Sequence, residues 1–285
     1  MILFGAAGES DSFRQQGYKN GSQMPLYLKG MGLDAFEYQC GRGVRVSEKS
    51  ALPIRQQAQQ QGIVYSLHAP YYISMSSLEE EKRLNSVDYI LQSARAIRLL
   101  GGRRIIFHSG SCGKQSREAA LEKAMDTMAR MVEAVDREGF GDLTLCPETM
   151  GKVGQLGTLE EVLALCSVDK RITPCIDFGH LNARTQGGCA DKAAMAALLD
   201  KMADALQDDR ASHFHAHFSM IEYTAGGEKR HLTFADGRSF GPDYEPLLEL
   251  LYQRGLEPVI ICESAGTQAE DAAAMKGYYQ QLQGG

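Results

Sequence analysis

The 285-residue sequence lacks the features that mark several common protein classes. No apolar run approaches the ~18 residues that a membrane-spanning helix needs. The first residues, MILFGAAGESDS, have neither a basic start nor a long apolar stretch, so we expect no secretion signal. No stretch rich in proline, glycine and serine divides the chain, and no low-complexity run interrupts it. We therefore expect a single domain over residues 1–285, with no membrane association.

Cysteine pairs at metal-binding or redox spacing are also absent. The seven cysteines are an odd number and include no Cys-x-x-Cys pair. Cys146, Cys175 and Cys262 lie inside strand-like apolar runs, and Cys40 follows one. Cysteine in such places acts as a small buried apolar side chain, which indicates a reducing, cytoplasmic setting.

An excess of positive charge is missing as well. Lys and Arg total 30 against 36 Asp and Glu, which gives a net charge of -6. Proteins that bind nucleic acid usually present a basic surface. A polyanionic substrate would have to be attracted by a local basic patch or by bound metal ions.

Short strand-like runs alternate with amphipathic helical stretches along the chain. The strand-like runs are 1–7, 34–39, 62–69, 103–109, 142–148, 171–178, 212–218 and 257–264. The longest helical stretches are 78–100, 116–139, 191–206, 243–254 and 268–283. Eight strands that are each followed by a helix predict an α/β fold of the (β/α)₈ TIM-barrel type. The polar, glycine-rich connection 219–242 is expected on the catalytic face.

Imidazoles and carboxylates recur at the predicted carboxyl ends of the strands, where barrel enzymes build their sites. They are His68, His108, Glu148, Asp177, His180, His217, His231 and Glu263. Each one alone could be a structural residue. Buried carboxylates cost several kcal/mol unless they are paired or coordinated, and no Lys or Arg matches them at these ends. Together they predict a multinuclear site for Zn²⁺ or Mn²⁺.

The run ASHFHAHFSM places three histidines at every second position, which is the periodicity of a strand face. Inward side chains of a barrel strand stack in layers, and only the last layer opens to the catalytic mouth. His217 is therefore the predicted ligand, and His215 is a candidate to hydrogen-bond a ligand from below. His213 lies ~13 Å from His217 at strand rise and is expected to be structural, near the barrel floor.

Seven short segments carry a more specific pattern. They are LHAPYYIS (67–74), IFHSGS (106–111), LCPETMG (145–151), CIDFGHLNA (175–183), HFS (217–219), RH (230–231) and CES (262–264). The His-x-Pro-Tyr run and the Asp-x-x-His pair are the most specific of them. With these segments the chain resembles, over nearly its full length, the endonuclease IV family, multi-zinc apurinic/apyrimidinic endonucleases with a xylose-isomerase-like TIM barrel.

The resemblance implies ligands for two or three zinc ions. His68 and His108 would hold one ion and share Glu148 as a bridging carboxylate. A second ion would be completed by Asp177, His217 and Glu263, and a third would be held by His180 and His231.

The implied activity is cleavage of damaged double-stranded DNA 5′ to abasic sites in base excision repair. Its nucleophile would be a metal-bridged hydroxide positioned by Glu148. Tyr71 would match an aromatic residue that contacts the DNA near the abasic nucleotide, although a tyrosine packed on the rim is an open alternative. No obligate protein partner is evident.

Two positions depart from the family pattern. Where the family reads Asp-x-His for the third ion, this chain reads EKRH (228–231), with Lys229 at the expected aspartate. A protonated ammonium cannot ligate, so either Glu228 substitutes for the aspartate or the third ion loses a ligand. The strand that ends in His217 continues HFSM, without the acidic or amide side chain expected two or three positions later.

Basic residues of the predicted rim loops are candidates to hold DNA phosphates. They are Arg42, Arg45, Lys114, Lys152, Arg184, Lys229, Arg230 and Arg238. Some of them are expected to be ordinary solvated charges. The acidic total charge predicts modest, salt-sensitive affinity.

A second hypothesis is a divalent-metal sugar isomerase or epimerase of the same barrel class. Such enzymes use Glu, Asp, His and Glu from successive strands around one ion, and Glu148, Asp177, His217 and Glu263 supply that set. A mononuclear sugar site has no use for the surplus histidines, which favours the endonuclease. A third hypothesis, a structural or sensor metal barrel, is disfavoured by the open strand-end site and the long loop above it.

Overall fold

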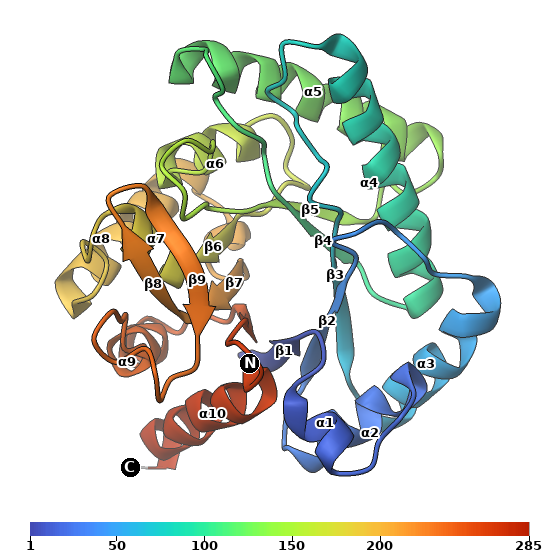
Figure 1. Ribbon diagram of the computed structural model, residues 1–285, viewed down its shortest axis with the longest axis vertical. Helices are drawn as coiled ribbons and strands as arrows, with labels where there is room; N and C mark the ends of the chain where they lie inside the picture. The colour runs from blue at the N-terminus through green and yellow to red at the C-terminus, as the bar shows by residue number, and fades with distance from the viewer. Residues whose placement is uncertain (285) are drawn as a thin grey trace.

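The computed structural model describes residues 1–284, in which strands and helices alternate along the chain (Figure 1). The strands are β1 (Leu3–Ala7), β2 (Ala35–Gln39), β3 (Val64–His68), β4 (Arg104–Phe107), β5 (Thr144–Pro147), β6 (Cys175–Asp177), β7 (His215–Phe218), β8 (Met220–Thr224), β9 (Gly227–Leu232) and β10 (Val259–Cys262). The α-helices are α1 (Asp11–Gln15), α2 (Met24–Gly30), α3 (Glu48–Gln61), α4 (Glu80–Leu100), α5 (Arg117–Arg137), α6 (Leu159–Cys166), α7 (Phe178–Arg184), α8 (Lys192–Leu206), α9 (Tyr244–Arg254) and α10 (Gln268–Gly284).

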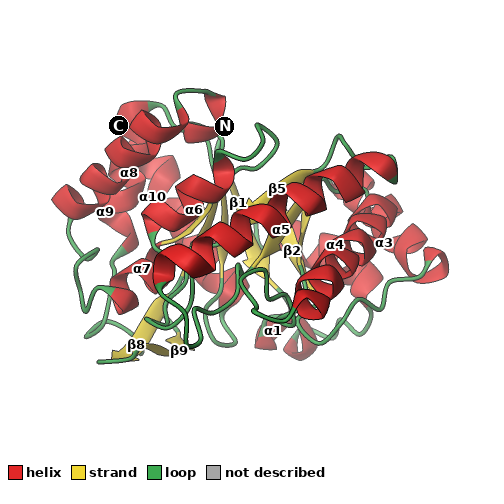
Figure 2. Cartoon of the chain, turned by 90° about the horizontal axis from the view of Figure 1, so that it is seen from above, coloured by secondary structure: helices red, strands yellow, loops and turns green. Residues whose placement is uncertain are grey.

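Within residues 1–284, eight parallel strands form one sheet in the order β5-β4-β3-β2-β1-β10-β7-β6. The two end strands meet through the parallel bridges Leu145–Ile172 and Glu148–Cys175, so the sheet curls into an almost closed barrel. The helices surround it (Figures 1 and 2). The predicted (β/α)₈ barrel is confirmed.

Local signals in the sequence explain where the surrounding helices begin and end. Ser47, Ser116 and Thr158 precede α3, α5 and α6, and each side chain accepts a hydrogen bond from the backbone of the first helical turn. Gly62 and Gly101 end α3 and α4 in the left-handed conformation, which glycine adopts without strain. These caps set the helix lengths and leave the loops between to carry the site.

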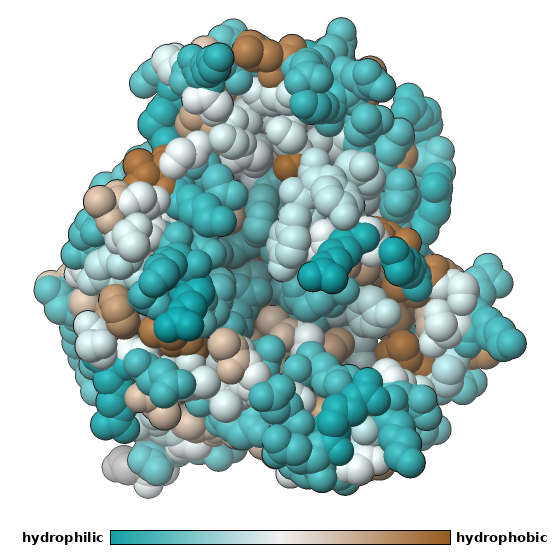
Figure 3. Space-filling model, in the orientation of Figure 1, coloured by the Kyte–Doolittle hydropathy of each residue, from teal (hydrophilic) through white to brown (hydrophobic). Residues whose placement is uncertain are grey.

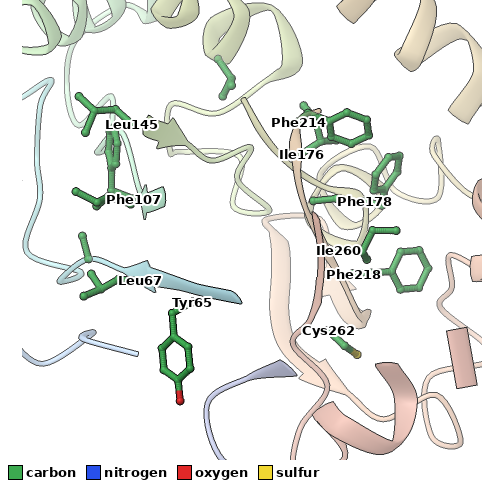
Figure 4. Packing of buried hydrophobic residues seen from close by; sticks show 14 of the residues in the cluster. Tyr65, Leu67, Phe107, Leu145, Ile176, Phe178, Phe214, Phe218, Ile260 and Cys262 are labelled. Carbon is green, nitrogen blue, oxygen red and sulfur yellow. The ribbon is translucent and has the colours of Figure 1, made fainter. Parts of the chain in front are cut away.

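The hydrophobic core lies mainly between the barrel and its helices. Outward-facing strand residues such as Leu67, Phe107 and Phe218 are fully buried there, and Figure 4 shows them on opposite sides of the barrel. Alternate residues of the same strands face inward. Two small apolar clusters, which contain Ile106 and Ile261, fill part of the interior. The rest of the interior is polar, so the apolar layer that stabilises the fold is separate from the site.

The connection 219–242 is not an irregular loop, because it contains the antiparallel hairpin β8–β9. The hairpin projects from the end of the barrel opposite Met1 (Figure 2). It is fastened to the loop after β5: the amide of Glu228 donates to the carbonyl of Gly151, and the amide of Val153 donates to the carbonyl of Gly226, both at 3.1 Å. Across residues 1–284, no helix combines the length and the apolar character that crossing a membrane requires.

Candidate metal centre

The inward carboxylate of Glu148, which follows β5, lies at the carboxyl end of the barrel strands, among the candidate ligands. It is buried, and its two oxygens face different sets of histidines. Oε2 lies 3.2 Å from His68 Nε2 and 3.3 Å from His108 Nε2. Oε1 lies 3.1 Å from His180 Nδ1 and 3.2 Å from His217 Nδ1. One carboxylate is therefore placed to be shared between two neighbouring ions.

The first cluster consists of His68, His108 and Glu148, whose potential ligand atoms lie within 4.8 Å of one another. The Nδ1 of His68 lies 2.9 Å from the carbonyl oxygen of Ala69. Because a carbonyl can only accept, Nδ1 carries the hydrogen, which leaves the lone pair of Nε2 for an ion that His68 would share with Glu148. The ring of Tyr71 stacks on His108 with centroids 5.3 Å apart. Tyr71 is nevertheless 57% exposed, so it packs on the rim and still presents its other face to a ligand.

The second cluster adds Asp177, His217 and Glu263 to the shared Glu148, again within 4.8 Å. Asp177 lies at the junction of β6 and α7, where one carboxylate oxygen caps the helix by accepting from the amide of His180. Its other oxygen, Oδ2, is buried and lies 3.0 Å from His180 Nδ1, although no hydrogen bond to it is well aligned among the described residues. His217 Nδ1 lies 3.6 Å from Glu263 Oε2.

The third cluster consists of His180, Glu228 and His231. Glu228 Oε2 lies 3.4 Å from His180 Nε2, and Glu228 Oε1 lies 3.9 Å from His231 Nε2. Lys229 turns away from the site and pairs with Glu222 on the exposed side of the hairpin. Of the two alternatives that the sequence left open, the geometry therefore favours Glu228 as the acidic member.

The sequence lacks the acidic or amide side chain expected after His217 to hold a ligand in place, but a serine hydroxyl occupies a similar position. The hydroxyl of Ser219, in HFSM, lies 2.9 Å from His231 Nδ1, so it can fix the ring while Nε2 faces Glu228. Sequence reasoning looked for an acidic or amide group and passed over this serine.

The electrostatics of the site suit divalent cations. Burial alone would raise the pKa of Glu148, but the charge of His217 and hydrogen bonds from His108 and His180 hold that pKa well below its usual range. Burial raises the pKa of Asp177 to about 6. A buried carboxylate such as that of Asp177 is costly unless a cation or a charged partner such as the His180 ring compensates it. Imidazole and carboxylate together are ligands that both Zn²⁺ and Mn²⁺ accept, so the residues present fit such ions.

The three histidines of ASHFHAHFSM have different surroundings. His217 is fully buried beside Glu148, and its ring packs edge-to-face on the buried ring of His215. His215 contacts none of the candidate ligands through a hydrogen bond; its Nε2 lies 3.0 Å from Glu37 Oε2 instead. The predicted floor position of His213 is wrong. His213 precedes β7, its side chain is 54% exposed, and it lies 3.7 Å from Glu257 outside the barrel.

A pocket of about 430 Å³ opens above the three clusters, and Figure 3 shows a hydrophilic hollow at the centre of this face. Tyr71, Lys152 and Gln155 line the pocket beside the candidate ligands. Lys152 is the only residue of the predicted phosphate-binding set in this lining.

The other predicted phosphate contacts have mixed outcomes. Arg184 is not available to a substrate, because its guanidinium donates to the carbonyl oxygens of residues 150, 152, 153 and 155 and so holds the loop after β5. Lys229 and Arg230 both pair with Glu222 on the exposed hairpin. Arg42 and Arg45 line a separate surface pocket in the loop after β2. The loop is adjacent to the site, since a Cβ at Gly41 would collide with the ring of Tyr71.

Comparison with known proteins identifies relatives of the chain as a whole. The family model described as "Xylose isomerase-like TIM barrel" matches residues 26–280. An uncharacterised protein of Methanocaldococcus jannaschii is 31% identical over 98% of this chain and 97% of its own length. A protein of Malacoplasma penetrans named "Probable endonuclease 4" is 30% identical over 41% of this chain and 40% of its own length.

Solved structures with the same fold include two different kinds of enzyme by name. A D-tagatose 3-epimerase-like protein aligns with a TM-score of 0.71 at 19% identity, over 99% of this chain and 98% of its own. Endonuclease IV from Thermus thermophilus aligns with a TM-score of 0.69 at 18% identity, over 98% of this chain and 99% of its own. At these identities the similarity shows the fold alone.

Proposed function

The chain belongs to the xylose isomerase-like TIM barrel family, and we propose that within it the protein is a metal-dependent apurinic/apyrimidinic endonuclease. It hydrolyses the DNA backbone 5′ to abasic sites, in base excision repair. The observation that carries this proposal is that two ligand clusters share the carboxylate of Glu148 and a third adjoins it through His180. A phosphodiester hydrolase uses several ions in this way, to stabilise charge on both the attacking and the leaving oxygen.

The residues have separable tasks in this proposal. His68 and His108 would hold one ion, Asp177, His217 and Glu263 a second, and His180, Glu228 and His231 a third. When bound, such ions supply an activated water as nucleophile and neutralise phosphate charge. Glu148 faces both the first and the second cluster, so it fixes their separation. Lys152 lines the pocket and is placed to pair with a phosphate oxygen.

Binding to DNA is proposed through a small number of contacts. Tyr71 would lie against the sugar and bases next to the lesion, with Arg42 on the adjacent loop and Arg230 on the hairpin. Arg230 would have to exchange its contact with Glu222 for a phosphate. With so few basic groups, binding to damaged double-stranded DNA is expected to be modest and salt-sensitive. The seven cysteines, all buried and unpaired, suit a reducing cytoplasm.

One observation favours a second candidate function. Glu148, Asp177, His217 and Glu263 form a complete four-residue cluster by themselves, which is what a mononuclear sugar isomerase or epimerase would need. That reaction has no task for the other two clusters. The endonuclease uses all three, and so it remains the better proposal.

A paired measurement separates the two functions. Metal content per chain is measured by elemental analysis, and the same preparation is incubated with duplex DNA that carries one tetrahydrofuran abasic analogue, with and without EDTA. We expect two or three zinc ions per chain and a single nick 5′ to the analogue, abolished by EDTA and restored by Zn²⁺ or Mn²⁺. A single tightly held ion, no nicking, and epimerisation of a ketose would contradict the endonuclease and support the alternative.

A further inference from the structure

A buried carboxylate lies directly beneath the candidate metal centre, inside the barrel. Glu37 extends inward from β2 and is fully buried. Among the described residues no lysine or arginine pairs with it; its charged partners are the rings of His215 and His217. Ser66 Oγ also donates to its Oε2 at 3.0 Å. A carboxylate in such a place is costly to bury, and its contacts with histidine are what compensate for that cost.

The ring of His217 connects this carboxylate to the metal centre. Its Nε2 lies 3.1 Å from Glu37 Oε1, while Nδ1 faces Glu148 at 3.2 Å and Glu263 at 3.6 Å. A neutral imidazole carries one hydrogen and one lone pair on its two nitrogens. Both nitrogens face carboxylates, and Nδ1 makes a hydrogen bond with Glu148 Oε1; an ion bound on the Nδ1 side would take that lone pair and leave the hydrogen on Nε2, where Glu37 can accept it. The lone pair of Nδ1 then points into the cluster of candidate ligands.

His215 holds the other side of the same carboxylate. Its Nε2 lies 3.0 Å from Glu37 Oε2, and its ring packs on that of His217 with centroids 5.3 Å apart. The contact between Glu37 and His217 is close but not linear, since no acceptor is aligned with His217 Nε2 among the described residues.

We propose that Glu37 is a positioning residue for the second ion: it fixes the tautomer and the ring orientation of His217, so that Nδ1 is presented between Glu148, Asp177 and Glu263. Carboxylate–histidine–metal arrangements of this kind raise metal affinity by orienting the ligand. The proposal rests on the metal centre assigned under the proposed function. It does not depend on which substrate that centre acts on.

The test is Glu37→Gln, with metal binding as the readout. The amide has the same size but only one accepting atom, so it cannot accept from both His215 Nε2 and His217 Nε2, and the preference for a hydrogen on His217 Nε2 is weakened. We expect the affinity for one ion to fall by about 10- to 100-fold, while the other ions bind as in the wild type. Equilibrium dialysis against Zn²⁺ in a chelator buffer gives the number and affinity of the ions. Co²⁺ absorption reports the loss of one imidazole ligand.

Ser66→Ala is the matched control, because it removes a neutral hydrogen bond from Glu37 and leaves both histidine contacts. It should bind metal as the wild type does. Wild-type affinities in Glu37→Gln would overturn the proposal. So would an equal loss at every ion accompanied by a lower melting temperature of the metal-free variant, since that result would make Glu37 a general structural residue.

A measurement on the wild type covers the case in which Glu37→Gln does not fold. Ring ¹H–¹⁵N correlation spectra of the zinc-loaded protein should place the hydrogen of His217 on Nε2 and the ion on Nδ1, and the reverse assignment would refute the proposal. Failure of this proposal and failure of the proposed function give different results. A wild-type protein that binds metal but does not nick abasic DNA would contradict only the endonuclease, and the metal affinities of Glu37→Gln would still test the role of Glu37.

Discussion

Glu228 Oε2 lies 3.4 Å from His180 Nε2, although Glu228 precedes His231 by three positions and not by two. In a regular strand, residues three apart point to opposite faces. Here the pairing of β8 with β9 shifts between Glu222 and Tyr223: Glu222 pairs with Arg230, and Tyr223 with Glu228. Lys229 is the extra residue of this bulge, so Glu228 and His231 return to the same face.

Glu228→Ala should therefore remove a ligand of the third ion. We expect metal content to fall by up to one ion per chain and nicking to fall by about 10- to 100-fold, because charge on the leaving oxygen is no longer neutralised. Lys229→Ala is the control, since it removes only the exposed pair with Glu222. Elemental analysis and abasic nicking are measured on both variants. An equal loss in Lys229→Ala would contradict the bulge assignment.

His108→Ala tests the first ion separately from the sugar-type cluster. His108 belongs to the cluster with His68 and Glu148 and is absent from the cluster of Glu148, Asp177, His217 and Glu263. Losing an ion that supplies about 4 kcal/mol of transition-state stabilisation should slow nicking by roughly 1000-fold. The second cluster should still bind one ion, which metal analysis can detect. Unchanged nicking would refute the role of the first cluster.

The barrel was predictable because strand and helix periodicity alternate so regularly, and because a strand's carboxyl end is recognisable by where its apolar run stops. That placement predicts His68, His108 and Glu148 at one rim, and the three side chains do lie together there. The predicted strand runs are longer than the observed ones, as in 171–178 against β6 (Cys175–Asp177). Pro174 has no amide hydrogen to donate, which accounts for part of that difference.

The residues that surround the candidate ligands were harder to predict than the ligands themselves. Glu37 lies 178 residues from His215 in sequence, and β1 and β10 lie between their two strands, so only the curvature of the sheet brings the side chains together inside the barrel. Its signal was a glutamate in an inward position of the run DAFEYQ, which periodicity alone does not distinguish from an exposed one. His213 shows the converse error. The predicted run 212–218 begins three residues before β7 (His215–Phe218), and His213, which lies in that excess, has an exposed side chain.

The docking of the hairpin should be sensitive to substitution at Gly227. This glycine has φ +90°, and a Cβ built on it would lie 2.1 Å from the carbonyl oxygen of Gly151. Gly227→Ala should destabilise the fold by about 1–3 kcal/mol and lower affinity for the third ion, because Glu228 is the next residue. Gly226→Ala is a matched control, since its Cβ would meet only Thr224 Oγ1 at 3.7 Å. Urea unfolding and metal titration are the measurements. Equal effects of the two substitutions would argue against close packing at this point.

Glu161 should give the fold a specific acid sensitivity. Burial alone would raise the pKa of its carboxyl, but Arg117 and the amides of Gly157 and Thr158 donate to it and hold the pKa below its usual value. A depressed folded-state pKa means that the stabilisation is complete above the unfolded-state pKa of about 4.3. It is lost as pH falls through the lower, folded-state value. Arg117 also donates to the carbonyl of Val153, so this anchor holds the loop to which the hairpin is fastened.

Glu161→Gln should therefore lower the free energy of unfolding by about 2 kcal/mol at pH 7, the scale of charge-assisted hydrogen bonds. Because the amide does not titrate, the difference between wild type and variant should shrink as pH falls below about 4. Urea unfolding of both proteins between pH 3 and pH 7 measures that difference. Glu160→Gln is the control, since its pair with Lys201 is exposed and should contribute little. A difference that stays constant from pH 7 to pH 3 would show that Glu161 acts through its shape and not through its charge.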